Sequence, residues 1–151
     1  MLFSLYLLFK KIKHTMDLYA FLQKFHSGWA YLALLLLVVA VVNAIIGFTS
    51  KKEFTAKDRK IALFGLIGSH VQLLVGLILY FVSPLGFAGF SMKVAEARLT
   101  SLEHPLINVI ALVLITIGWS KHKKAATSEL KFKSFAVFYT LGLLLILARI
   151  P

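Results

Sequence analysis

Three histidines lie in or at the edges of long apolar segments of this 151-residue chain, namely His26, His70 and His104. An imidazole can ligate a metal, carry a proton or hydrogen-bond a neighbouring helix. An ionisable side chain inside a bilayer is costly, so by default it marks a ligand, proton or cofactor site. His70 is the most informative of the three, because it lies near the middle of the run IALFGLIGSHVQLLVGLILYFV.

The composition indicates an integral membrane protein. The chain is 60% hydrophobic and has a mean hydropathy of +0.87, whereas soluble domains contain about 45–50% apolar residues. Its length allows one small helical bundle and no second domain. The chain has no cysteine, which excludes disulfides, thiolate metal sites and covalent haem attachment through Cys-x-x-Cys-His.

Four uncharged apolar segments predict the fold. We expect an all-α protein, an integral membrane four-helix bundle formed by residues 26–151, with spans at about residues 28–48, 61–82, 103–119 and 132–149. A helix needs about 20 residues to cross the hydrocarbon core, so the last two spans require extension or tilt. The third either begins near Pro105 or starts earlier, with Thr100 and Glu103 as a capping box and Pro105 as a kink.

The net charge of +11 is concentrated in two of the connecting loops. Residues 49–60 and 120–133 carry ten of the 17 basic side chains, a placement that indicates positive-inside topology and contact with anionic lipids, not nucleic-acid binding. We therefore expect a bacterial inner (cytoplasmic) membrane location, with these loops cytoplasmic and both termini outside. His122 lies in the second basic cluster and is expected to contact lipid headgroups with it.

The N-terminal residues 1–25 fit this topology least well. The run MLFSLYLLF is too short to span, and its lysines follow the apolar run, whereas in a secretory signal they precede it. One interpretation is that Met16 is the true start. Another, compatible with the first, is an interfacial helix at about residues 17–25, where Leu18, Phe21, Leu22 and Phe25 form one apolar stripe.

Small residues predict which helix faces approach closely. In the first span they recur at helical spacing, and in the second a small and polar stripe excludes His70, which points about 120° away. The two stripes are Ala33, Ala40, Ala44 and Gly47, and Gly65, Gly68, Ser69, Gln72 and Gly76. A bundle helix has two neighbours, so His70 can still face the interior and hydrogen-bond another helix.

The depths of the histidines allow two of them to share one metal. At 1.5 Å per residue, His70 and His104 differ by about 8 Å in depth, which places their Cα atoms roughly 12 Å apart across packed helices. That separation suits two imidazoles on opposite sides of one haem iron. His26 lies about 10 Å from His104 in depth on the same estimate, so either could serve the outer side, and His26 is an alternative ligand or a propionate partner. Aromatic-belt packing is the competing interpretation of His26.

The segments around these histidines resemble a known group of proteins. HSGW, SHVQLLVGLILYFVSP and LEHPLINVIALVLITIGWSKHKK are similar to small four-helix bacterial membrane proteins loosely described as cytochrome b-like, over about residues 20–125. The resemblance implies a b-type haem and implicates His26, His70 and His104 as its ligands. The fourth span has no histidine, which leaves one haem at most.

Two functional hypotheses follow from the sequence. The first is an inner-membrane protein that binds one haem b through His70 and His104, with His26 in reserve, and carries electrons to or from quinone or another respiratory-type membrane partner. The second is a non-catalytic small membrane subunit or assembly protein, alone or as a homo-oligomer, whose histidines are interhelical hydrogen-bond residues. Neither is an enzyme by itself, and no mid-span carboxylate supports an ion-coupled transporter.

Overall fold

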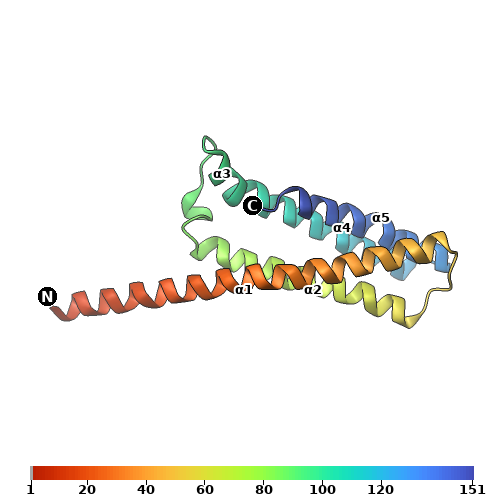
Figure 1. The fold of residues 1–151 in the computed structure, drawn as a ribbon, viewed down its shortest axis with the longest axis horizontal. Helices are drawn as coiled ribbons and strands as arrows, with labels where there is room; N and C mark the ends of the chain where they lie inside the picture. The colour runs from red at the N-terminus through yellow and green to blue at the C-terminus, as the bar shows by residue number, and fades with distance from the viewer. Residues whose placement is uncertain (1) are drawn as a thin grey trace.

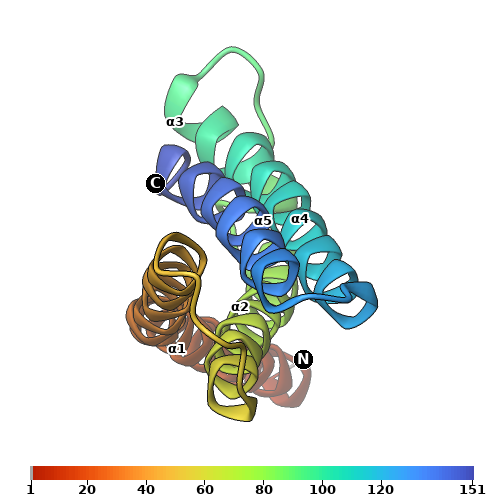
Figure 2. The same cartoon turned by 90° about the vertical axis from the view of Figure 1, so that its right-hand side faces the viewer.

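The computed structural model describes residues 2–151, and over this range it is helical without strands. Four long helices, or helical runs, form the bundle seen from the side in Figure 1 and end-on in Figure 2. Its α-helices are α1 (Leu2–Thr49), α2 (Ala56–Val82), α3 (Ala95–Arg98), α4 (His104–Lys124) and α5 (Ser128–Ala148). Four stretches are long and apolar enough to cross a membrane: Phe3–Thr49, Ala56–Val82, Ala95–Lys124 and Ser128–Ala148. The prediction of an all-α protein with four helices of spanning length is confirmed.

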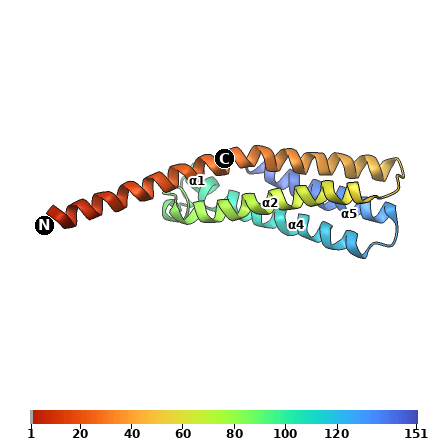
Figure 3. The same ribbon diagram turned by 90° about the horizontal axis from the view of Figure 1, so that it is seen from below.

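Helix α1 is longer than the sequence suggested. It runs without a break through the segment expected to form a separate interfacial helix at residues 17–25. The segment contains no proline, and the isolated Gly28 costs only about 1 kcal/mol in a helix interior, too little to end it. Figure 3 shows the N-terminal half of α1 extending past the bundle, with apolar side chains such as Phe3 and Phe21 exposed. A start at Met16 and an interfacial position stay predictions.

The predicted small-residue stripes meet each other between α1 and α2. Ala33 and Ala40 are buried, and a Cβ added to Gly65 would lie 3.2 Å from the Cβ of Ala40 and 3.4 Å from a backbone carbonyl of α1. At Gly68 an added Cβ would lie 3.5 Å from the Cα of Ala33. The Trp29 indole N–H also donates to the Gly68 carbonyl at 3.0 Å. The two backbones are therefore as close as small residues allow.

The turn between α1 and α2 encloses a buried charge. Lys51 has a φ of 51°, and the Lys52 N–H bonds the Gly47 carbonyl at 3.0 Å, which ends α1 in a Schellman-type turn. This turn brings the Lys52 ammonium within 2.8 Å of Asp58, which is 1% exposed. Asp58 also accepts from the backbone N–H of Thr55 at 2.9 Å and from Asn43 at 3.1 Å. Thr55 and Asp58 together form the capping box of α2.

Helices α4 and α5 pack through aromatic residues near the end of the bundle that holds the turn between α1 and α2. Tyr139 is fully buried and donates its hydroxyl to the Ala62 carbonyl of α2 at 3.0 Å. The Phe54 N–H bonds the Ser128 hydroxyl at 3.0 Å, which ties the two basic loops together. Both loops lie at one end of the bundle (Figure 1), as the expected topology requires.

The expectation that His122 contacts lipid headgroups was wrong. Its residue is 3% exposed, and its ring lies 4.5 Å, centre to centre, from those of Trp119 and Phe135. Its Nδ1 atom bonds the Trp119 carbonyl one turn back. A side chain three residues beyond Trp119 returns to the same helix face, so the imidazole packs inward while the neighbouring lysines stay outside.

The third spanning stretch starts at Ala95, earlier than residue 103, because a π-helical turn carries the chain past a proline. Pro105 has no N–H and its ring conflicts with the carbonyl four residues earlier. The turn Leu99–Glu103 widens the helix there, and the His104 N–H bonds the Leu99 carbonyl. Thr100 lies within the helix and donates to Glu96 at 3.0 Å, so it does not begin a capping box.

We expect Gly65→Leu to destabilise the bundle by about 1–3 kcal/mol, because the added side chain must separate α1 from α2. Thermal unfolding in mild detergent, followed by circular dichroism, measures the loss. Gly28→Leu is the matched control, since nothing lies within 4 Å of a Cβ at Gly28. Equal effects of the two substitutions would contradict the close packing.

Asp58→Ala should cost roughly 2–4 kcal/mol, because it removes the carboxylate half of the capping box of α2 and leaves Asn43 without its charged acceptor. Lys52→Ala should cost less than about 1 kcal/mol, since the lysine side chain is half exposed and Asp58 keeps its other donors. The same unfolding assay compares them. A larger loss for the lysine variant would show that the ion pair, not the cap, matters most.

Candidate functional site

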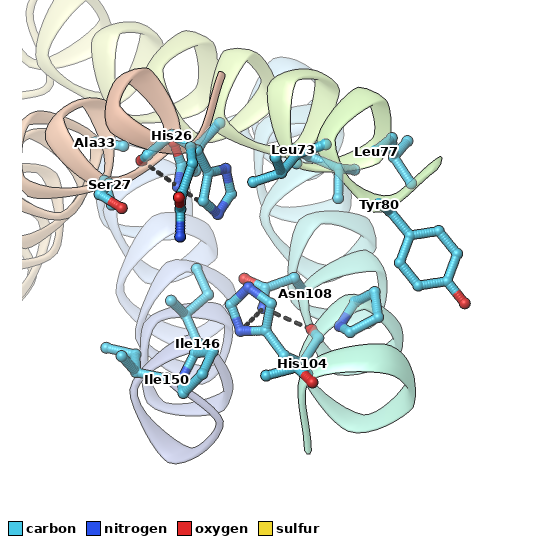
Figure 4. A pocket seen from close by; sticks show the side chains of 18 of the residues that line it. His26, Ser27, Ala33, Leu73, Leu77, Tyr80, His104, Asn108, Ile146 and Ile150 are labelled. Atoms are coloured by element: carbon cyan, nitrogen blue, oxygen red, sulfur yellow. Dashed lines mark hydrogen bonds between the residues drawn. The ribbon is translucent and has the colours of Figure 1, made fainter. Parts of the chain in front are cut away.

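The structure brings His26 and His104 together. Their ring centres are 6.3 Å apart and the rings are nearly perpendicular, at 81°. His26 comes from α1 and His104 from the first turn of α4, and in Figure 4 both rings point into the space between the helices. The sequence placed these two histidines about 10 Å apart in depth, and the fold brings their rings close together.

The two rings line a cavity of about 570 Å³ between α1, α2, α4 and α5. Its walls are mostly aliphatic, as Leu73, Leu77 and Ile146 illustrate, with a few polar groups that include Gln72 and Asn108. A cavity of this size and character matches pockets for small molecules and cofactors. It lies toward the end of the bundle opposite the basic loops.

Hydrogen bonds orient the His104 ring. Its Nδ1 lies 2.7 Å from the backbone carbonyl of Arg149, which can only accept, so Nδ1 carries the proton and donates. The Asn108 amide donates to the His104 carbonyl at 2.7 Å, and its 3.2 Å approach to Nδ1 joins two donors and is not a bond. The Nε2 of His104 is then left with a free lone pair. A carbonyl that fixes the tautomer in this way is typical of metal-ligating histidines.

His26 and Gln72 leave polar atoms without partners. The Gln72 amide lies 3.1 Å from the His26 carbonyl, to which it donates, and 3.3 Å from the ring Nε2. The Nδ1 of His26 and the Oε1 of Gln72 are buried and have no hydrogen-bond partner. Each such atom costs about 1–3 kcal/mol, and together they indicate a water, ion or ligand in the cavity.

Glycine makes room for the His26 ring. A Cβ added at Gly76 would lie 3.0 Å from the Cε1 atom of His26, so any larger residue would push the ring out of its position against α2. Gly76 belongs to the small and polar stripe predicted for the second span. Its contact with the His26 ring explains why this position is a glycine.

An ion-pair group lies beside His104, at the end of the bundle opposite the basic loops. Glu103 lies 2.8 Å from Arg98 and 3.3 Å from Arg149, where the sequence suggested a helix-capping role for it. The pairing holds the end of α5 against the start of α4, and it positions the carbonyl that orients His104.

His70 lies outside the cavity, in a second groove between α2 and α4. Its Nδ1 lies 2.8 Å from the Leu66 carbonyl and its Nε2 lies 3.4 Å from the Thr116 hydroxyl. The groove of about 300 Å³ is lined by His70, Thr116 and aliphatic residues. His70 therefore faces a different helix neighbour from the small-residue stripe, as the sequence allowed, and it does not contact His104.

The donor set bears on which metal groups could fit. Among residues 2–151 no group of three or more His, Asp or Glu side chains could hold a metal ion. The cavity offers two imidazoles on opposing helices. Two axial nitrogens suit a metal that brings its own equatorial ligands, as a porphyrin does.

Two features of the site were absent from the sequence-based prediction. The Arg149 carbonyl lies 45 residues from His104, and a backbone atom carries no sequence signal. Gln72 was assigned to the small and polar stripe, but its contact with His26 depends on the register of α1 against α2. The Gly–Ala spacing of the two stripes was the one signal from which that register could have been derived.

Asn108→Leu tests the orientation of His104. We expect its Nδ1 to stay protonated, because the Arg149 carbonyl remains the acceptor. Nitrogen NMR of ¹⁵N-histidine-labelled protein in detergent distinguishes the two tautomers. A switch to the Nε2-protonated form would show that the Asn108 amide had been donating to Nδ1, and that Nε2 is not the free atom.

Comparison with known proteins finds no family model, no curated protein and no solved structure that matches this chain. The functional conclusion therefore depends on the geometry described above.

Proposed function

We propose that this protein is an inner-membrane electron carrier that binds one haem b between His26 and His104. The observation that carries the proposal is the 6.3 Å separation of the two ring centres. Two metal–nitrogen bonds of about 2 Å each, with the ring radii added, require roughly 6 Å between imidazoles that bracket one iron. The unpartnered Nδ1 of His26 and the free Nε2 of His104 agree with an additional group between them.

Bound haem would supply one-electron redox chemistry, and the residues of this chain would set its conditions. The Arg149 carbonyl holds the His104 ring in one tautomer and leaves its Nε2 free to ligate. The bond from Gln72 to the His26 carbonyl does not involve the ring, so it would persist if the ring held a metal. The aliphatic walls exclude water, and a dry site disfavours the added charge of the oxidised centre.

This assignment differs from the pairing of His70 with His104 that the sequence favoured. In the proposal His26, the alternative ligand, takes the position opposite His104, because those two rings line the same cavity and His70 lines another. The haem content of His70→Leu tests whether His70 is a ligand.

We place the four helices across a bacterial cytoplasmic membrane with the two basic loops inside, next to anionic lipids. Both loops lie at one end of the bundle (Figure 1), and the cavity lies toward the other. The haem would then be near the outer face, where a quinone or another respiratory-type membrane partner can exchange electrons with it.

The second candidate is a small membrane subunit without a cofactor. It is favoured by the observation that the two cavity histidines already have polar contacts with another helix or its end: His26 with Gln72 and His104 with Arg149. Such contacts are worth about 0.6–2 kcal/mol in membranes and need no ligand.

A reduced-minus-oxidised absorbance spectrum of the purified full chain, produced with ample haem, separates the two candidates. We expect sharp α and Soret bands at one haem per chain. His26→Leu or His104→Leu should lower haem content to below about a tenth, since each removes an axial ligand, while His70→Leu retains it. His14→Leu on the exposed part of α1 is the matched control.

A flat spectrum from well-folded protein would refute haem binding and support the cofactor-free subunit. Loss of haem in His70→Leu, together with retention in His26→Leu, would instead show that His70 is the axial partner of His104.

A further inference from the structure

The hydrogen bonds of His70 leave one of its nitrogens free. Nδ1 lies 2.8 Å from the Leu66 carbonyl, which can only accept, so Nδ1 is protonated and Nε2 is an acceptor. The Thr116 hydroxyl has one hydrogen, and it lies 2.8 Å from the Leu112 carbonyl but 3.4 Å from Nε2. The hydroxyl therefore donates to the carbonyl, and the lone pair of Nε2 has no donor among residues 2–151.

This free acceptor lies on the outer surface of the bundle. His70 is exposed and sits near the middle of α2, roughly 20 Å from either end at 1.5 Å per residue. In a spanning orientation, this position faces hydrocarbon, where no water can satisfy the lone pair. A polar atom at this depth implies a partner that brings a hydrogen-bond donor to it.

The walls of the groove decide the kind of partner. They are branched aliphatic side chains, namely Leu73, Val109, Leu112, Val113 and Ile117. A transmembrane helix packs closely through glycine and alanine, and the three glycines of α2, Gly65, Gly68 and Gly76, already face α1. The space of about 300 Å³ is at the small end of the range for small-molecule pockets, and it contains no charged group.

We propose that the groove formed by His70, Thr116 and these aliphatic residues binds the phenolic ring of a lipid-soluble molecule, whose hydroxyl donates to Nε2 of His70. The occupant is neutral because the groove has no counter-charge, and it is lipid-soluble because the groove opens toward hydrocarbon. A phenolic hydroxyl is a stronger donor than an aliphatic one, and a flat ring fits between Val109 and Val113. The inference depends on membrane insertion but not on haem.

The test uses 4-octylphenol and its methyl ether, 4-octylanisole, which has the same ring and chain but no donor. The full-length, ¹⁵N-histidine-labelled protein is placed in phospholipid nanodiscs, and the Nε2 resonance of His70 is followed during each titration. Empty nanodiscs measure simple partition into lipid. Haem content is recorded separately, so failure of this proposal is distinguishable from failure of the haem proposal.

We expect a saturable shift of the His70 Nε2 resonance with 4-octylphenol, and binding about tenfold weaker for 4-octylanisole, the loss that one hydrogen bond produces. His70→Phe should remove the preference for the phenol over the ether. Val113→Trp should block the groove and abolish binding while the histidine remains. His26→Leu, outside the groove, should change neither ligand's affinity.

Equal affinity of phenol and ether, or an undiminished preference in His70→Phe, would overturn the proposal. So would self-association of the chain in nanodiscs that disappears in His70→Phe and Val113→Trp, because a second copy would then be the occupant of the groove. Analytical ultracentrifugation of the detergent-solubilised variants measures that association.

Discussion

The close approach of α1 to α2 is the constraint on which the rest of the structure depends. Gly65 and Gly68 leave space for the Ala40 and Ala33 side chains, and a larger residue at either position would crowd α1. Once the two backbones are this close, the register between them is set over their shared length. That register places Gln72 and Gly76 beside His26 at the end away from the basic loops, and Asn43 beside Asp58 at the end that carries them.

The two ends of the bundle are packed according to different needs. At the end that carries the basic loops, the buried Asp58 carboxylate has several donors and the aromatic rings around Phe135 fill the interior. At the opposite end the helices surround a cavity in which buried polar atoms have no partner. A bundle that filled this second end equally well would be more stable but would have no space for a ligand there. The well-packed end holds the helices together while the other end keeps its cavity.

Helix number, helix faces and the shared end of the basic loops could be predicted from the sequence, because each depends on local composition or on a periodicity of 3.6 residues. The hydrogen-bond partner of the His104 ring could not be predicted, because it is a backbone carbonyl at the end of α5. His122 was misjudged for a related reason: its lysine neighbours indicated exposure, but its own side chain packs on Trp119 and Phe135. Depth estimated along the helices placed His104 nearer to His70, at about 8 Å, than to His26, at about 10 Å, whereas the packing of the helices brings His26 to it.

The chemistry available at each histidine depends on which ring nitrogen donates to a backbone carbonyl. In His104 and His70 the Nδ1–H donates to a carbonyl, which leaves the lone pair of Nε2 able to ligate or accept. Among the described residues, no carbonyl accepts from the His26 ring, and its buried Nδ1 has no partner. Under the haem proposal, His104 would therefore be the oriented ligand and His26 the ligand whose ring adjusts. One oriented ring facing one adjustable ring would accommodate a group that enters after the helices have packed.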